Sequence, residues 1–417
     1  MNGRTAVGRL GPFGQRAFAV YWAGGMLSNI GTWLQNVAAS VYVYDRTGSA
    51  FAVGLLNFAS FLPILLFSVM GGVLSDRFDR RAIVVATQTL SLLLAAALAL
   101  SVWAGGATEV HIIATAFVLQ TSWSIAKPAL IAILPALVPR ADLAEAVGLN
   151  TLQFIVGQIA GPILATVILA TGGYAWAFGI NAATFLGPIL AMAYLYRRAL
   201  GRGVARARSV AAGVGLVAYV RGQPWVGSAL LAVVSTSAIL EVVRTTAPVL
   251  VSQRLGAPTT DAGLIIAAQS LGSAFGLLAF IPLRRWDISR RVPAVGLVLQ
   301  ASGLITLSTA TTLPVAAVGV AAIGTGFSLC FPIVTGVLQV EVPDALRGRL
   351  MSIHQMAHLG NRPFAALAVG AIAGSLGVPA ACLAALLLVP LGLAAVRATW
   401  RGLAPTAVPE PAVAQSF

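Results

Sequence analysis

Ionisable residues inside long apolar runs are the strongest candidates for chemistry in this chain. Glu241 is followed three positions later by Arg244, so the two could pair across less than one helical turn. His354, His358 and Arg362 recur every four residues and would share one helix face as a continuous stripe. Burial favours the neutral form of a carboxyl group, and imidazole titrates near neutral pH. These patterns make the residues candidates for binding and releasing protons within the apolar runs. Two alternatives stay open: a static Glu241–Arg244 ion pair, and histidines that only hydrogen-bond across helices.

A second polar stripe lies in the first apolar run. Asn29, Trp33 and Asn36 fall at helical spacing, and such a stripe inside a membrane span faces a wet cavity or another helix. Gln120 is a polar candidate in the fourth apolar run. Together with the ionisable residues, these four side chains form the predicted substrate and proton pathway.

The composition places these residues in a membrane protein. Of the 417 residues, 58% are hydrophobic and only 9% are charged, whereas soluble domains have about 25% charged residues. The net charge is +14, but the basic residues are scattered through short polar stretches, so we expect no nucleic-acid partner. Cys330 and Cys382 both lie in apolar runs, which predicts neither a disulfide nor a metal site.

Sequence motifs for enzymatic chemistry are absent. The chain has no phosphate-binding loop of the Gly-x-x-x-x-Gly-Lys-Ser/Thr type, no His-Glu-x-x-His pair and no nucleophile elbow. The sequence therefore predicts a protein that is not an enzyme and has no cofactor. The first fifteen residues lack the apolar core of a cleavable signal peptide, so we expect the first apolar run to be a span.

The elements that must position the candidate residues are membrane-spanning helices. A span needs about 20 apolar residues. The hydropathy pattern predicts an all-α polytopic protein with twelve spans, approximately 17–43, 50–73, 82–104, 110–134, 143–170, 173–196, 225–250, 260–283, 292–311, 314–339, 347–374 and 376–397. Lys127-Pro128 interrupts the fourth run, so we expect its helix to end near Ala126, with 127–142 along the surface. A short surface helix is expected at Val214 to Val220.

The basic residues predict the orientation. Of the 26 lysine and arginine residues, all but four lie on one side of the predicted spans. Arg46 and Arg254 lie on the other side, and Arg244 and Arg362 lie within spans. Because basic loops stay in the cytoplasm, both termini are predicted to be cytoplasmic and the protein to reside in the cell membrane. Asp45 and Arg46 are expected to form a solvated outer turn; an external gate contact is the alternative.

The loop between the second and third spans carries a family signature. Gly72, Leu74, Asp76 and Arg77 are followed by the basic pair Arg80 and Arg81. This order resembles the loop signature of the major facilitator superfamily, although Asp79 stands where that family usually has glycine. Physically, a tight turn would hold the two helices together, Asp76 could cap or face a helix, and the arginines could pair with carboxylates. We predict a cytoplasmic gate at Gly72, Asp76, Arg77, Arg80 and Arg81; the alternative is a solvated loop that only sets orientation.

The fifth span carries a second signature. Gly157, Gly161 and Pro162 resemble the Gly-x-x-x-Gly-Pro motif of the drug- and proton-antiporting branch of that superfamily, which implies export. The match is partial, because Ala165 and Thr166 replace the usual final glycines. Two glycines on one face allow close helix approach, and proline kinks a helix. An ordinary small-residue packing face is the alternative.

Two further segments point to one subfamily. The order Ser-Asn-x-Gly-Thr-Trp-x-Gln at 28–35 and the segment Leu-Arg-Gly-Arg-Leu-Met-Ser at 346–352 resemble the exporter subfamily that contains the enterobactin exporter. The resemblance implies two pseudo-symmetric six-helix bundles with a substrate site between them. We expect the domains at 1–196 and 225–397, a cytoplasmic linker at 197–224 and a disordered tail at 398–417.

These observations predict a monomeric proton-driven exporter of a small amphipathic molecule, such as a siderophore, an antibiotic or a drug-like compound. Its expected partners are the small-molecule substrate, protons and the lipid bilayer. Arg244, Arg362 and the two histidines outnumber the single acid within the spans, which favours anionic or neutral cargo over cationic cargo. An uptake permease of the same fold and a non-transporting receptor or scaffold are the alternatives.

Overall fold

A computed structural model describes residues 11–200, 214–283 and 290–403. In these residues the chain is helical, with no strand, which confirms the predicted fold class. The α-helices are α1 (Arg16–Thr47), α2 (Ala50–Arg77), α3 (Arg80–Trp103), α4 (Glu109–Ile133), α5 (Leu143–Thr171), α6 (Gly173–Thr184), α7 (Leu186–Arg197), α8 (Val214–Gly222), α9 (Pro224–Gln253), α10 (Ala262–Leu283), α11 (Val292–Thr309), α12 (Leu313–Glu341), α13 (Asp344–Leu359), α14 (Arg362–Leu386) and α15 (Leu388–Gly402). Short 3₁₀ turns η2 (Gly11–Gly14), η3 (Leu134–Ala136), η4 (Arg140–Asp142) and η5 (Thr259–Asp261) complete the described elements.

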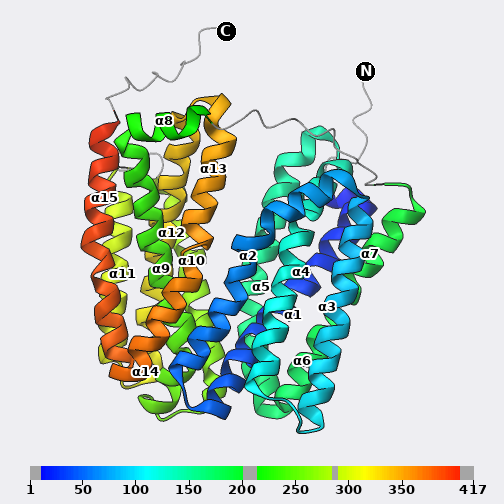
Figure 1. Ribbon diagram of the computed structural model, residues 1–417, viewed down its shortest axis with the longest axis horizontal. Coiled ribbons are helices and arrows are strands. Elements are labelled where there is room, and N and C mark those ends of the chain that lie inside the picture. Colours follow the sequence, from blue (N-terminus) through cyan, green and yellow to red (C-terminus); the bar gives the residue numbers. More distant parts are fainter. Residues whose placement is uncertain (1–10, 201–213, 284–289, 404–417) are drawn as a thin grey trace.

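The helices make the predicted twelve membrane crossings. Ten helical stretches of the described chain are long and apolar enough to span a bilayer. The last of them, Leu346–Gly402, has 57 residues and is too long for one crossing of a ~30 Å core. It turns back at Gly377, where φ is +84°, and so crosses twice. The 32-residue α1 runs beside these helices and supplies the remaining crossing (Figure 1).

Two boundary predictions were wrong. α4 does not end near Ala126: it continues through Lys127 and Pro128 to Ile133, because a proline-kinked helix can continue where neighbouring helices pack around it. The last helix runs to Gly402, so 398–402 are not part of a disordered tail. Residues 404–417 of that predicted tail and 201–213 of the predicted linker lie outside the described residues. The predicted surface helix is α8, which lies across the ends of α9 and α13 (Figure 1).

The helices form two groups, α1–α7 and α9–α15 (Figure 1). One end of the molecule carries Arg77, Arg80, Arg140 and Arg197 and is called the arginine-rich face below. The opposite end carries the turns after α1, α3 and α9 and is called the arginine-poor face. How 197–224 divides the chain into domains stays a prediction.

Close helix packing depends on small residues. In the second group, a Cβ at Gly303 would lie 2.4 Å from the Gly319 carbonyl oxygen, and one at Gly324 would lie 2.0 Å from the Gln269 carbonyl oxygen. Helix association in a bilayer relies on such close approach, because lipid provides no hydrophobic drive between helices. Cys330 and Cys382 are free cysteines, and both are buried.

The two groups meet mainly toward the arginine-poor face. There α2 and α14 touch backbone to backbone: a Cβ at Gly54 would lie 2.7 Å from the Ala366 carbonyl oxygen, and one at Gly370 would lie 3.0 Å from the Ala50 carbonyl oxygen. α5 and α10 meet in the same way at Gly263. Figure 1 shows the two groups converging at this end.

Candidate functional site

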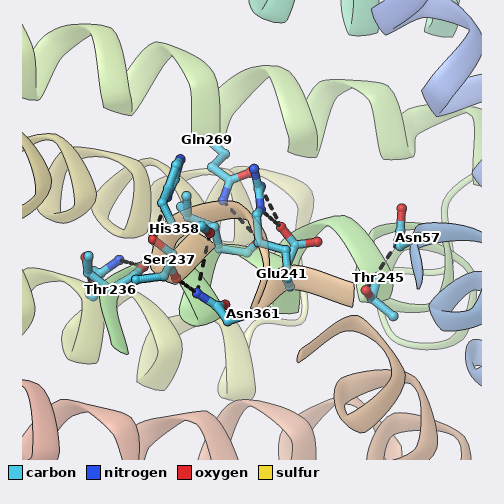
Figure 2. Close-up of polar contacts among 12 residues, drawn as sticks. Asn57, Thr236, Ser237, Glu241, Thr245, Gln269, His358 and Asn361 are labelled. Atoms are coloured by element: carbon cyan, nitrogen blue, oxygen red, sulfur yellow. Dashed lines mark hydrogen bonds and ion pairs between the residues drawn. The ribbon is translucent and has the colours of Figure 1, made fainter. Parts of the chain in front are cut away.

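The polar centre of the protein is one face of α9. Ser237, Glu241 and Thr245 follow one another at four-residue intervals and therefore share that face. Each binds a different helix (Figure 2): the Ser237 hydroxyl lies 2.7 Å from His358 Nδ1 on α13, Glu241 pairs with α14, and Thr245 Oγ1 accepts a 3.3 Å hydrogen bond from Asn57 on α2. α9 thus connects its own group with the first.

Glu241 is paired with Arg362, and not with Arg244 as the sequence alternative proposed. Arg362 Nε donates to Glu241 Oε1 over 2.6 Å, and Arg362 Nη2 lies 2.5 Å from the same oxygen. Glu241 is completely buried and Arg362 is 6% exposed. Glu241 Oε2 is buried and has no hydrogen-bond partner in the described chain. This acid therefore has one satisfied oxygen and one oxygen free to accept a proton.

Arg244 points toward the other group of helices. Its guanidinium carbon lies 4.6 Å from the centre of the Trp33 ring on α1 and 5.8 Å from that of Phe61 on α2. The Arg362 guanidinium lies 4.4 Å from the same Phe61 ring. Two cations of the second group thus contact aromatic rings of the first group. The faces of aromatic rings attract cations electrostatically. Phe61, in an apolar run, carries no polar signal and was missed by the sequence reasoning.

The predicted histidine stripe divides between two helices. His354 Nε2 lies 2.9 Å from Thr335 Oγ1 on α12, whereas His358 binds Ser237 on α9. The ring of Phe331 lies 5.4 Å from that of His354 and 4.4 Å from that of His358. These contacts are the cross-helix hydrogen bonds that the alternative interpretation expected. Any role of the histidines in proton transfer stays a prediction.

The eleventh crossing is interrupted beside the ion pair and is not the single helix predicted over 347–374. α13 ends at Leu359 and α14 begins at Arg362. Pro363 lacks an N–H donor and clashes with the preceding turn, which breaks the helix. The Asn361 side chain donates to the carbonyls of Ala357 and His358 and so satisfies backbone groups freed by the break. The break orients Arg362 toward α9.

The other predicted pathway residues are less closely connected. Asn29 Nδ2 donates to Gln153 Oε1 on α5 over 3.2 Å. Asn36 and Gln120 are half-buried, and neither side chain has a hydrogen bond among the described residues. Sequence reasoning missed the buried pair Gln35–Asn181, because isolated amides carry no recognisable spacing.

The glycines of the fifth-span motif are packed against α1. A Cβ at Gly161 would lie 2.4 Å from Trp33 Cβ, and one at Gly157 would lie 3.0 Å from Asn29 Cβ. Pro162 faces the other group: a Cβ at Gly263 of α10 would lie 2.3 Å from its carbonyl oxygen. The motif therefore positions Trp33 and forms part of the junction between the groups. Its role in export stays a prediction.

The loop between α2 and α3 is organised by Asp79, which the sequence analysis treated only as a departure. Asp79, and not Asp76, caps α3 by accepting from Arg81 N, and it forms a 2.7 Å ion pair with Arg81 Nη2. This arginine lowers the pKa of Asp79 below its usual range. Arg81 also donates to the Leu200 carbonyl, and Arg80 donates to the Ala132 carbonyl.

The remaining gate residues are free in this conformation. Asp76 and Arg77 are exposed, and neither makes a hydrogen bond or ion pair in the described chain. A Cβ at Gly72 would meet open space. The hairpin is thus anchored within the first group by Arg80 and Arg81, and its exposed pair has no hydrogen bond or ion pair to the described part of the second group.

Asp45 makes polar contacts on the arginine-poor face, where the sequence analysis expected a solvated turn and kept an external gate contact as the alternative. Asp45 Oδ2 accepts hydrogen bonds from the Tyr174 hydroxyl and, over 3.2 Å, from Thr259 Oγ1 in η5. Thr166 Oγ1 donates to the Thr260 carbonyl over 3.0 Å. Because η5 belongs to the second group, these bonds join the two groups. A pocket of about 330 Å³ lies nearby, lined by Gly48, Ser49, Ala50, Val249, Gln253, Ala373, Gly374 and Gly377.

Comparison with known proteins agrees with this architecture. The chain is 26% identical to the multidrug efflux pump Tap of Mycolicibacterium fortuitum, over 89% of this chain and 93% of the relative. It is 28% identical to the enterobactin exporter EntS of Citrobacter koseri, over 88% and 87%. The crystal structure of a bacterial homologue of the human lysosomal transporter Spinster, inward-facing and unoccupied, shares the fold with a TM-score of 0.70 at 14% identity, over 94% and 98%.

Residues 7–409 match the family described as transmembrane secretion effector, which covers almost the whole chain. Family and relatives are transporters and not enzymes, and the helices identify a multi-pass membrane protein. The chain therefore belongs to the transmembrane secretion effector family of major facilitator superfamily transporters.

Proposed function

We propose that this secondary transporter exports a small amphipathic molecule across the cytoplasmic membrane by alternating access, in exchange for protons. The main support is the buried Glu241–Arg362 pair between helices that line the junction of the two groups. The similarity to proteins named as exporters favours export over uptake. Positive residues on the arginine-rich face favour a cytoplasmic location for that face.

The contacts between the groups favour an inward-open conformation. Backbone contact between α2 and α14 and the hydrogen bonds of Asp45 close the arginine-poor face. At the arginine-rich face, Asp76 and Arg77 are exposed and make no hydrogen bond or ion pair among the described residues. Closing this face would bring the hairpin of α2 and α3 to the second group, where Asp76 and Arg77 could find partners.

The ion pair supplies a coupling mechanism. An ionised Glu241 holds Arg362, because a buried carboxylate without a cation is strongly unfavourable. A proton on Glu241 would remove the attraction and release Arg362 from α9. Since Arg362 also contacts Phe61 of the other group, its release would alter the junction. Proton binding would thereby shift the equilibrium between the two orientations.

The proposal is tested in everted membrane vesicles with fluorescent amphipathic probes, 2-naphthoate and ethidium, in separate assays. We expect at least one probe to accumulate when the pH gradient is imposed, and accumulation to stop when nigericin collapses that gradient. Glu241→Gln is expected to remove the response to the gradient, because the amide takes up no proton. The exposed Glu341→Gln is the matched control and should transport normally.

Two outcomes contradict the proposal. Probe loss from everted vesicles, with uptake by intact cells, would identify an uptake permease. Absence of transport for both probes would favour a receptor or scaffold.

A further inference from the structure

The positive charges at the junction of the two groups exceed the negative charge. Glu241 is the single acid of the chain that lies deep within a described helix; the others lie near helix ends or outside the described helices. Arg362 forms an ion pair with Glu241. Arg244 lies on the same helix as Glu241, and Lys127 lies on α4; neither has an ion-pair partner in the described chain.

Arg244 is placed to receive a ligand. Its side chain is half-buried, whereas Glu241 and Arg362 are buried. Its Nε is buried without a hydrogen-bond partner among the described residues. The guanidinium rests near Trp33 and Phe61, which keeps it at the boundary of the two groups.

Lys127 approaches the same region from the first group. Its ammonium lies 4.4 Å from the centre of the Trp123 ring, one turn earlier on α4. Lys127 and Arg244 both lie within electrostatic range of His358, although they belong to different groups of helices. Arg244 lies within electrostatic range of Glu241, but the Glu241 carboxylate is already bound to Arg362. An uncompensated charge within a membrane protein is unfavourable, so an anion at this place would be strongly attracted.

We propose that the transported molecule is an organic anion with an aromatic or apolar body, and that Arg244 binds its anionic group. Arg244 presents planar donors that suit a carboxylate, and Trp33 and Phe61 supply an apolar surface for the body. Lys127 is a second cation that attracts the anion from the side of the first group. This inference rests on the proposed transport function. It assigns anion recognition to Arg244, because Arg362 is already paired with Glu241.

Binding to the purified full-length protein in nanodiscs tests the inference. The probes are 2-naphthoate and 2-naphthamide, which have the same shape and differ in charge. We expect the carboxylate to bind about tenfold more tightly than the amide, because a charge-assisted contact is stronger than a neutral one. Arg244→Gln should bring the two affinities together, Arg244→Lys should retain part of the preference, and Lys127→Gln should weaken it. Arg140→Gln, at an exposed position of the arginine-rich face, is the matched control.

The outcomes separate this inference from the proposed function, because binding is measured without a gradient. Equal affinities in the unmodified protein, absence of saturable 2-naphthoate binding, or a folded Arg244→Gln protein with unchanged preference would overturn it. Carboxylate-selective binding together with failed proton-driven transport would leave the anion site standing and reject the antiport proposal. Thermal unfolding of each variant establishes that it is folded.

Discussion

Single residues in this protein act through their partners. Glu241 and Arg244 are three residues apart, yet the carboxylate binds Arg362 and the guanidinium rests on aromatic rings of the other group. Gly161 also acts through a neighbour. Because it has no side chain, Trp33 can lie against α5 beneath Arg244. A residue without a side chain can therefore control the geometry of the site.

Replacing Gly161 by alanine tests this packing. The new Cβ would lie 2.4 Å from Trp33 Cβ and 2.8 Å from the Ile30 carbonyl oxygen, so α1 and α5 must separate. We expect a loss of about 1–3 kcal/mol of stability, as for other overpacked cores. The measurement is the midpoint of thermal unfolding in detergent. Gly148→Ala on the same helix, where a Cβ meets open space, should leave the midpoint unchanged or raise it. Equal midpoints for the two variants would refute the close packing of α1 and α5.

Among the elements, the hairpin between α2 and α3 has two parts with different roles. One part anchors the hairpin, and the other is the proposed gate. Asp79 and Arg81 attach it to the first group, and Asp76 and Arg77 remain exposed. The sequence resemblance treated the basic pair and Asp76 as one motif. In the structure, the basic pair and Asp76 have different environments. Substitution of Asp79 or Arg81 should therefore affect stability, and substitution of Asp76 or Arg77 should affect transport.

Asp79→Asn is expected to lower stability by about 1 kcal/mol at neutral pH, because it leaves Arg81 without its carboxylate. The Arg81 contact holds the pKa of Asp79 below its ordinary value, so its contribution is present above the unfolded pKa of about 3.9. That contribution disappears as the pH falls through the lower folded pKa. Unfolding midpoints measured across this range should converge for the variant and the unmodified protein. Asp76→Asn serves as the comparison and should keep the midpoint while reducing transport; a midpoint that falls as far as that of Asp79→Asn would contradict this division.

At the scale of the whole molecule, the two groups of helices are joined across the arginine-poor face. The Asp45 carboxylate binds Tyr174 in its own group and Thr259 in the other. An alternating-access cycle requires these bonds to break when this face opens. They are weak enough to do so, because a single hydrogen bond contributes about 1 kcal/mol.

Thr259→Val removes the hydroxyl that donates to Asp45 and should shift the population toward the outward-open form. A cysteine introduced at Ala373, which is 5% exposed beside the pocket between the groups, reports on this change. We expect a membrane-impermeant maleimide to label it several-fold faster when Thr259→Val is added, since losing about 1 kcal/mol changes a population ratio roughly fivefold. Ser302→Ala, which removes an exposed hydroxyl away from the junction, is the control. An unchanged labelling rate in the Thr259→Val background would show that this bond does not hold the face closed.

Much of the fold was accessible from the sequence, because apolar runs of membrane length and the distribution of arginine are local properties of the chain. Twelve crossings and an all-helical fold followed from them, together with the candidates Glu241, Arg244, His358 and Arg362. Proline effects were harder to predict: Pro128 is accommodated within α4, whereas Pro363 accompanies a break, and the surrounding helices decide between these results.

The partners of the candidate residues were decided only by tertiary structure. Spacing along one helix suggested Glu241 with Arg244, but the free energy of a buried charge depends on which groups surround it in space. Arg362 comes from 121 residues away, and Phe61 gives no polar signal at all. The charges that lie within the membrane could be identified from the chain alone, because each such residue stands out against an apolar run. The packing of the two helix groups determined which of those charges are neutralised and which, above all Arg244, remain available to a ligand.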